Sequence, residues 1–157
     1  MNDDLRSLHL LLDHTERQRD AALSEHGRLE TARRAAASQA EQLVVYRREY
    51  EQRWAAEFSR EGKIELVRCY QGFMERLSQA VDQQERLATH AALQAERSVG
   101  LVRDHEVRAA ALRKLIGRRQ GQADLASARL EQKQSDELAA RIAWMRAGAG
   151  KVLGAGR

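Results

Sequence analysis

Apolar residues recur at seven-residue intervals through most of this 157-residue chain. The series before Gly62 is apolar or aromatic except at its threonine: Leu8, Thr15, Ala22, Leu29, Ala36, Leu43 and Tyr50. The series after Gly62 is apolar throughout: Val67, Met74, Val81, Ala88, Ala95, Val102, Ala109, Ile116, Ala123 and Leu130. Companion positions such as Leu12, Ala40, Leu77 and Leu112 widen the apolar seam. Heptad repeats sustained over so many turns predict coiled-coil helices rather than ordinary surface helices.

The periodicity lapses in the segment FSREGKIEL around Gly62, which predicts a helix end and a turn near residues 59–64. One short turn between two long amphipathic helices favours an all-α, antiparallel two-helix coiled-coil hairpin, with the second helix longer than the first. We expect this hairpin to form a single domain over residues 1–147. A parallel dimer of straight helices is the alternative, and the loss of phase at Gly62 weighs against it.

The hairpin predicts which residues of the two helices lie side by side. If positions pair so that their numbers add to about 123, residue 5 meets residue 118. Residues 119 to about 146 then have no partner helix. The glycine-rich segment 148–157 is expected to be a flexible tail.

Composition supports helices and excludes several functional classes. The chain has no proline and no alternating run rich in Val, Ile and Thr, so no strand is expected. The seam is interrupted by Arg19, His26, Arg33 and His105, so its packing should be imperfect. Net charge is +4, and the excess lies in the last forty residues, with eight Lys and Arg against four Asp and Glu. This charge is too dilute and too mixed with acids for a nucleic-acid-binding arm.

The N-terminal sequence and the cysteine content predict the cellular compartment. Cys69 is the only cysteine, so no internal disulfide can form and a reducing compartment is expected. The start MNDDLRSLHLLLD is acidic and carries no small-residue cleavage site, so it is not read as a signal peptide. No stretch approaches the 18 or more apolar residues of a membrane span. We expect a soluble, cytoplasmic protein with no direct membrane insertion.

No pattern of catalytic or ligand-binding residues emerges. The segment GAGK at 148–151 lacks the glycine and the Ser or Thr of a phosphate-binding loop, since Met145 and Val152 occupy those positions. The five histidines include no pair three or four residues apart, and none lies near Cys69 in the sequence. We therefore expect no enzyme activity, no catalytic residues, no cofactor and no metal site.

Aromatic residues gather in one region of a chain that has only seven of them. Tyr46, Tyr50, Trp54 and Phe58 follow at steps of four, and Tyr70 and Phe73 come soon after the turn. Four such residues fan across about 120° of a helix, more than a two-helix seam can bury. Two interpretations stay open: the rings clamp the hairpin near its turn, or some of them form an exposed partner-binding patch.

A symmetry in spacing supports the second interpretation. Gln39, Leu43, Tyr46 and Tyr50 are spaced 4, 3 and 4 residues apart. Phe73, Leu77, Ala80 and Gln84 repeat this spacing, and the two sets pair about a sum of 123. The eight residues should therefore lie side by side on the two helices as one stripe.

These segments resemble a known family. QLVVYRREYEQRW, then a glycine, then ELVRCYQGFMERLSQAVDQQ, and later RLEQKQSDELAAR, are similar to the flagellar export protein FliJ, from Leu5 to about Ala143. The resemblance implies an antiparallel two-helix coiled coil that acts as the non-enzymatic central stalk of the flagellar type III export ATPase. Its counterparts serve virulence secretion systems.

The resemblance also implies partners and sites. The partners are the export ATPase hexamer and the cytoplasmic domain of the export gate protein, with export chaperones as further candidates, at the cytoplasmic face of the inner membrane. The family's gate-binding stripe corresponds to Gln39, Leu43, Tyr46, Tyr50, Phe73, Leu77, Ala80 and Gln84. At the last of these positions the family often has histidine. By analogy, the basic far end would meet the ATPase ring through Arg118, Arg119, Arg129, Lys133 and Arg141.

Two other non-enzymatic functions compete with the stalk. An export chaperone or escort would bind short amphipathic segments of secretion substrates through the same exposed apolar surface. A purely structural coiled coil would form homodimers, whereas the stalk hypothesis predicts a monomer.

Overall fold

The computed structural model describes residues 2–60 and 62–154 of the chain. Helix α1 spans Asn2–Phe58, a length of 57 residues, and helix α2 spans Ile64–Gly154, a length of 91 residues. The two helices pack against each other, and the described ranges contain no strand. The predicted all-α helical hairpin with a longer second helix is therefore confirmed.

Residues 59–63 connect the two helices. At the end of α1, Ser59 donates twice to the carbonyl oxygen of Ala55, from its backbone nitrogen at 3.3 Å and from its Oγ at 3.0 Å. These bonds satisfy one of the carbonyl groups that a helix end leaves free. Gly62 lies four residues beyond α1, and no described glycine has a positive φ. A serine, rather than a left-handed glycine, thus caps the end of α1.

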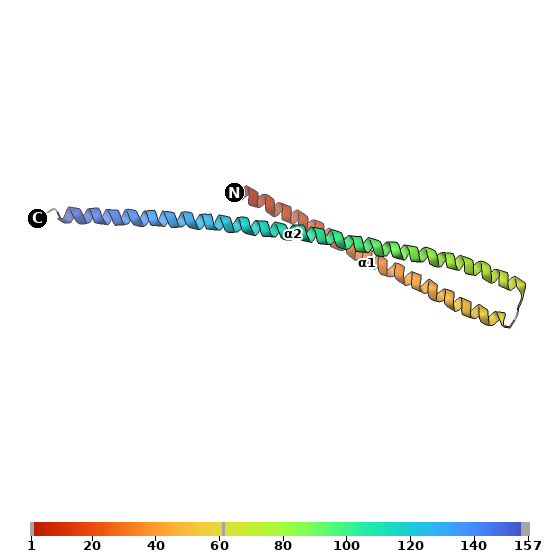
Figure 1. Cartoon of the computed structure of the whole chain (residues 1–157). Helices are drawn as coiled ribbons and strands as arrows, with labels where there is room; N and C mark the ends of the chain where they lie inside the picture. The colour runs from red at the N-terminus through yellow and green to blue at the C-terminus, as the bar shows by residue number, and fades with distance from the viewer. Residues whose placement is uncertain (1, 61, 155–157) are drawn as a thin grey trace. The chain divides into compact units, whose positions relative to one another are not determined.

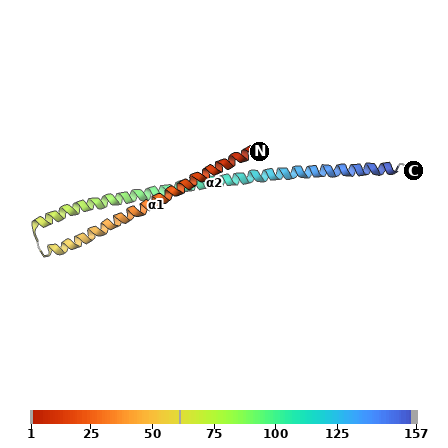
Figure 2. The same ribbon diagram turned by 180° about the vertical axis from the view of Figure 1, so that it is seen from behind.

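The chain divides into two compact units, residues 15–108 and residues 1–14 with 109–157. Within residues 15–108, α1 and α2 run antiparallel on either side of the connection (Figures 1 and 2). Gln84 Nε2 donates to Gln39 Oε1 at 3.0 Å across the two helices. The rings of Tyr50 and Phe73 also meet across them, with centroids 4.3 Å apart. The residue numbers in each pair add to 123, as the predicted register requires.

The heptad positions of this unit face the partner helix. Val81, Ala95 and Thr15 are buried, and the other members of both series between residues 15 and 108 are half-buried. Interruptions of the seam behave differently from one another: His26 and His105 are half-buried, and Arg33 is exposed. The seam therefore runs without a break through this unit, but it contains polar as well as apolar side chains.

The other unit joins the first turns of α1 to the second half of α2. Ala109 and Ile116 are buried there, and Leu8 on α1 is half-buried. Arg119 lies 3.9 Å from Asp4 in an ion pair between the two helices. Ala123 is half-buried, and it is the last such residue of α2. Pairing within this unit thus extends about five residues beyond the predicted limit of 118.

Residues 124–154 of α2 are exposed throughout. Leu130 is 58% exposed, so its predicted place in the seam is wrong. It continues the heptad series in sequence, but no residue of α1 lies opposite it in this unit. An apolar heptad position is buried only where a second helix covers it.

The glycine-rich end of the chain differs from the expected flexible tail. Helix α2 continues through Gly154, so residues 148–154 are helical, and residues 155–157 lie outside the described part. Each glycine disfavours a helix by about 1 kcal/mol relative to alanine. Alanines alternate with the glycines here, and extending an existing helix needs no new nucleus.

Candidate functional site

The eight residues of the predicted stripe lie within residues 15–108 and alternate between two neighbouring heptad positions on each helix. Leu77 is buried at 8% exposure, whereas Gln39 and Tyr46 are exposed. Five members are half-buried: Leu43, Tyr50, Phe73, Ala80 and Gln84. The stripe is therefore a strip of surface along one edge of the seam, partly structural and partly open to solvent.

Contacts at both ends bring the two halves of the stripe together. The hydrogen bond from Gln84 to Gln39 joins the end far from the turn. The ring contact between Tyr50 and Phe73 joins the end near the turn. Between these ends lies a shallow hollow, which is lined by Gln39, Gln42, Leu43, Tyr46 and Gln84.

The rings near the turn form a second, inner cluster, here called the aromatic clamp: Tyr50, Trp54, Phe58, Tyr70 and Phe73. Tyr70 of α2 contacts three rings of α1, with centroid distances of 6.3 Å to Tyr50, 5.5 Å to Trp54 and 5.2 Å to Phe58. Every member is half-buried. Aromatic pairs at these distances stabilise a fold beyond the area that they bury. The rings of the clamp thus hold the two helices together next to the connection.

Tyr46 belongs to the stripe but not to the clamp. Its ring lies 6.1 Å from that of Tyr50, and 46% of the residue is exposed. Val45 beside it is 43% exposed. An exposed ring next to an exposed aliphatic side chain and amide groups can bind an amphipathic protein surface, because the ring buries area and the amides offer hydrogen bonds. The clamp interpretation thus fits the rings near the turn, and the partner-binding interpretation stays a prediction that concerns Tyr46.

Sequence reasoning missed two residues of this surface. Gln42 lines the hollow beside Leu43 and also the neighbouring hollow beside Val45. Gln42 lies three residues after Gln39 and four before Tyr46, so helical spacing alone could have included it. Val45 occupies an outward heptad position, where an aliphatic residue has no structural use in the hairpin.

The basic residues expected at the far end are all exposed: Arg118, Arg119, Arg129, Lys133 and Arg141. Arg119 pairs with Asp4 of α1. Arg129 and Lys133 line a shallow hollow with Asp136 and Glu137, so acids moderate the positive charge there. These five residues lie along one helix without forming an enclosed site.

Two local charge pairs on α1 shift the pKa values of their carboxylates. A hydrogen bond from Arg33 is the main cause that lowers the pKa of Glu30 below its ordinary value. The equivalent bond from Arg28 lowers the pKa of Glu25. Pairs three residues apart on a helix stabilise it slightly, and these two carry no catalytic implication.

No group of three or more His, Cys, Asp or Glu side chains among residues 2–60 and 62–154 could hold a metal ion. Neither α1 nor α2, over the same ranges, has a stretch long and apolar enough to cross a bilayer.

Comparison with known proteins gives one match. The family described as "Flagellar FliJ protein" matches residues 5–148, which is most of the chain. No curated protein and no solved structure matches at a significant level.

Proposed function

Because the chain belongs to the FliJ family of flagellar export proteins, we propose that it is the central stalk of the flagellar type III export ATPase complex. In this role it links the ATPase ring to the cytoplasmic domain of the export gate protein and supports export of flagellar proteins. It acts at the cytoplasmic face of the inner membrane, at the flagellar base. The observation that carries the proposal is the family match over residues 5–148 of a two-helix hairpin.

The eight-residue stripe is the proposed gate-binding site. Support comes from its position on both helices and from the exposure of Tyr46 at 46%. A stripe built across two helices can bind only when the hairpin is intact, so folding and gate binding are linked. Gln84 is bound to Gln39 and remains a member of the site, although the family often has histidine at this position.

The proposed contact with the ATPase ring lies on α2, beyond its pairing with α1. Residues 124–154 are exposed on all sides, and Leu138, Ile142 and Met145 are large apolar residues among them. A helix with exposed apolar side chains favours enclosure by a partner. Arg129, Lys133 and Arg141 belong to this segment, and Arg118 and Arg119 precede it.

The stalk itself needs no active site. The FliJ family is a non-catalytic component of flagellar export. We propose that this chain likewise hydrolyses no nucleotide and requires no cofactor.

Two alternative functions share features with the flagellar stalk. A stalk of a virulence type III secretion system has the same architecture. Binding to the flagellar export ATPase or to the virulence ATPase distinguishes these two stalks. An export escort would use the exposed apolar surface of Tyr46 and Val45 to hold short amphipathic segments of secretion substrates or their chaperones.

The test compares two tyrosines that differ in position. Tyr46→Ala alters the exposed part of the stripe, and Tyr70→Ala alters the clamp outside the stripe. Binding of each variant to the purified gate domain and to the ATPase is measured by calorimetry, with helicity followed by circular dichroism. We expect Tyr46→Ala to weaken gate binding at least about ten-fold, the effect of a binding hot spot, with unchanged helicity. ATPase binding should persist.

Tyr70→Ala is the matched control. It should lower the melting temperature because three ring contacts are lost, yet bind the gate domain normally below the transition. Unchanged gate binding by Tyr46→Ala would remove the stripe as the site. Binding of amphipathic export segments, with no binding to gate or ATPase, would instead favour the escort.

A further inference from the structure

The seam within residues 15–108 changes character along its length. Near the turn, the heptad register sets bulky residues opposite one another, such as Leu43 opposite Val81 and Trp54 opposite Tyr70. This part, residues 43–58 with 70–81, is here called the turn section. Residues 19–36 with 88–105 form the polar section, where alanine, arginine, histidine and serine occupy most inward positions.

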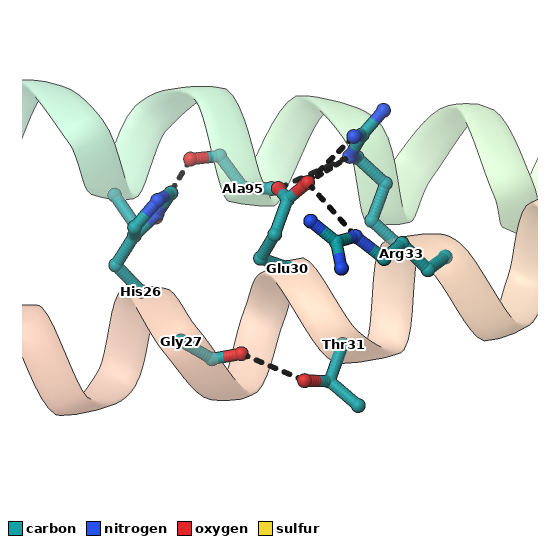
Figure 3. A network of polar contacts seen from close by, with 8 residues as sticks. His26, Gly27, Glu30, Thr31, Arg33 and Ala95 are labelled. Atoms are coloured by element: carbon teal, nitrogen blue, oxygen red, sulfur yellow. Dashed lines mark hydrogen bonds and ion pairs between the residues drawn. The ribbon is translucent and has the colours of Figure 1, made fainter.

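A hydrogen bond joins the two helices at the centre of the polar section. His26 of α1 points toward α2 (Figure 3), and its Nδ1 lies 2.7 Å from Ser98 Oγ. Ser98 is buried at 5% exposure, and its hydroxyl donates to the carbonyl oxygen of Ala95 at 2.6 Å. A serine hydroxyl has one proton to donate. Because that proton is committed to Ala95, Nδ1 of His26 carries the proton in the bond between the helices.

The layers on either side of this bond contribute little packing. Arg19 turns to a salt bridge with Asp20 at 3.0 Å on its own helix. His105 has a buried Nδ1 with no hydrogen-bond partner in the described part of the chain. Such an unsatisfied group destabilises the closed seam, because it has lost water without gaining a partner. Arg33 pairs with Glu30 of its own helix (Figure 3), and the two line a shallow hollow beside Ala95 of α2 instead of filling an inward position.

Helix α1 and helix α2 do not depend on closure of this section for their own backbone hydrogen bonds. Those bonds run within each helix. Separation of the helices here would expose few large apolar side chains, chiefly Leu29 and Val102. The turn section differs, since separation there would break the ring contacts of the clamp.

We propose that the polar section opens and closes reversibly while the turn section stays paired, with the His26–Ser98 hydrogen bond as the latch. Opening gives the hairpin a place to bend or twist without breaking either helix. The inference goes beyond the proposed function, because it holds whether or not the chain binds a gate or an ATPase.

The test measures distances between spin labels by pulsed electron resonance in the full chain, in a Cys69→Ser background. One pair, at Ser24 and Gly100, reports on the polar section; the other, at Val45 and Gln79, reports on the turn section. All four positions are exposed and lie on the outer sides of the helices. We expect the distance distribution between labels at Ser24 and Gly100 to be at least about twice as wide as that between labels at Val45 and Gln79. Equal widths would overturn the proposal.

Two sets of substitutions test the latch itself. His26→Leu with Ser98→Ala recreates the chemistry of the neighbouring Leu29 and Ala95 layer and should narrow the distribution in the polar section. Ser98→Ala alone leaves the His26 N–H without an acceptor and should widen it. The matched control, His90→Leu with Ser38→Ala, makes the same chemical changes at exposed positions and should leave both widths unchanged.

The double substitution should narrow the distance distribution and Ser98→Ala alone should widen it. If circular dichroism shows that one of these variants fails to fold, the other still tests the proposal. If neither set changes the width in the polar section, the His26–Ser98 bond is not a latch.

Discussion

At the scale of single residues, burial is concentrated in a few positions. Val81 is 1% exposed and is the largest fully enclosed side chain among the residues that the structure describes. Val81→Ala should lower the free energy of unfolding by roughly 2 kcal/mol, from two lost methyl groups and the cavity that they leave. Urea unfolding followed by circular dichroism measures this change.

Val107 offers the matched control, because the same residue type is 63% exposed on the same helix. Val107→Ala should change the unfolding free energy by less than about 0.5 kcal/mol. Equal effects at the two positions would mean that the seam does not bury Val81 in solution.

Glu30 gives a dependence on pH at the same scale. Its pKa is lowered from 4.5 in the folded chain, mainly by the hydrogen bond from Arg33. A lowered pKa means that the folded state favours the carboxylate, so its contribution to stability is complete above about pH 4.5 and is lost as pH falls through the folded value. The melting temperature of Glu30→Gln should therefore lie below that of wild type at pH 7, and the difference should shrink as pH falls below about 4.5. A difference that stays constant with pH would contradict this assignment.

At the scale of the helices, the two tryptophans test the clamp. Trp54 contacts Tyr50, Phe58 and Tyr70 at centroid distances of 5.3 to 5.8 Å, whereas Trp144 is 78% exposed. Trp54→Ala should reduce the unfolding free energy by on the order of 2 kcal/mol, since these contacts and part of the buried area are lost. Trp144→Ala should leave stability nearly unchanged. Thermal melting of both variants decides whether the clamp holds the hairpin.

The sequence predicted the helices, the antiparallel arrangement and the register because those features depend on periodicity. Leu130 shows where this reasoning ends: its heptad position is correct, yet whether a second helix covers it depends on the length of α1. Residues 148–154 show another limit, because local glycine preference yields to extension of a long existing helix.

The candidate stripe could be placed on one surface from spacing alone, but its exposure could not. Tyr46 and Tyr50 are four residues apart and chemically identical, yet Tyr46 is exposed and Tyr50 is half-buried. The difference comes from the second helix, which brings Tyr70 and Phe73 against Tyr50. The latch was likewise invisible in sequence, because His26 and Ser98 meet only in the folded hairpin.

For the whole molecule, the proposed stalk role predicts a monomer. Sedimentation equilibrium should give a mass near 17.8 kDa that does not change with concentration. The seam of residues 15–108 already pairs α1 with α2, so a second copy has little apolar heptad surface left to cover there. A dimer that persists on dilution would instead favour the structural coiled coil.

The two proposed binding regions should also be separable in one molecule. Deletion of residues 124–157 removes only positions that α1 does not cover or that lie after them. The hairpin should therefore keep its melting temperature and its binding to the gate domain, while binding to the ATPase is lost. Charge reversal by Arg129→Glu with Lys133→Glu should weaken ATPase binding in the full-length chain, because both exposed cations belong to the proposed contact. Retention of ATPase binding by the shortened chain would move that contact to the paired part of the hairpin, and loss of gate binding would show that one surface serves both partners.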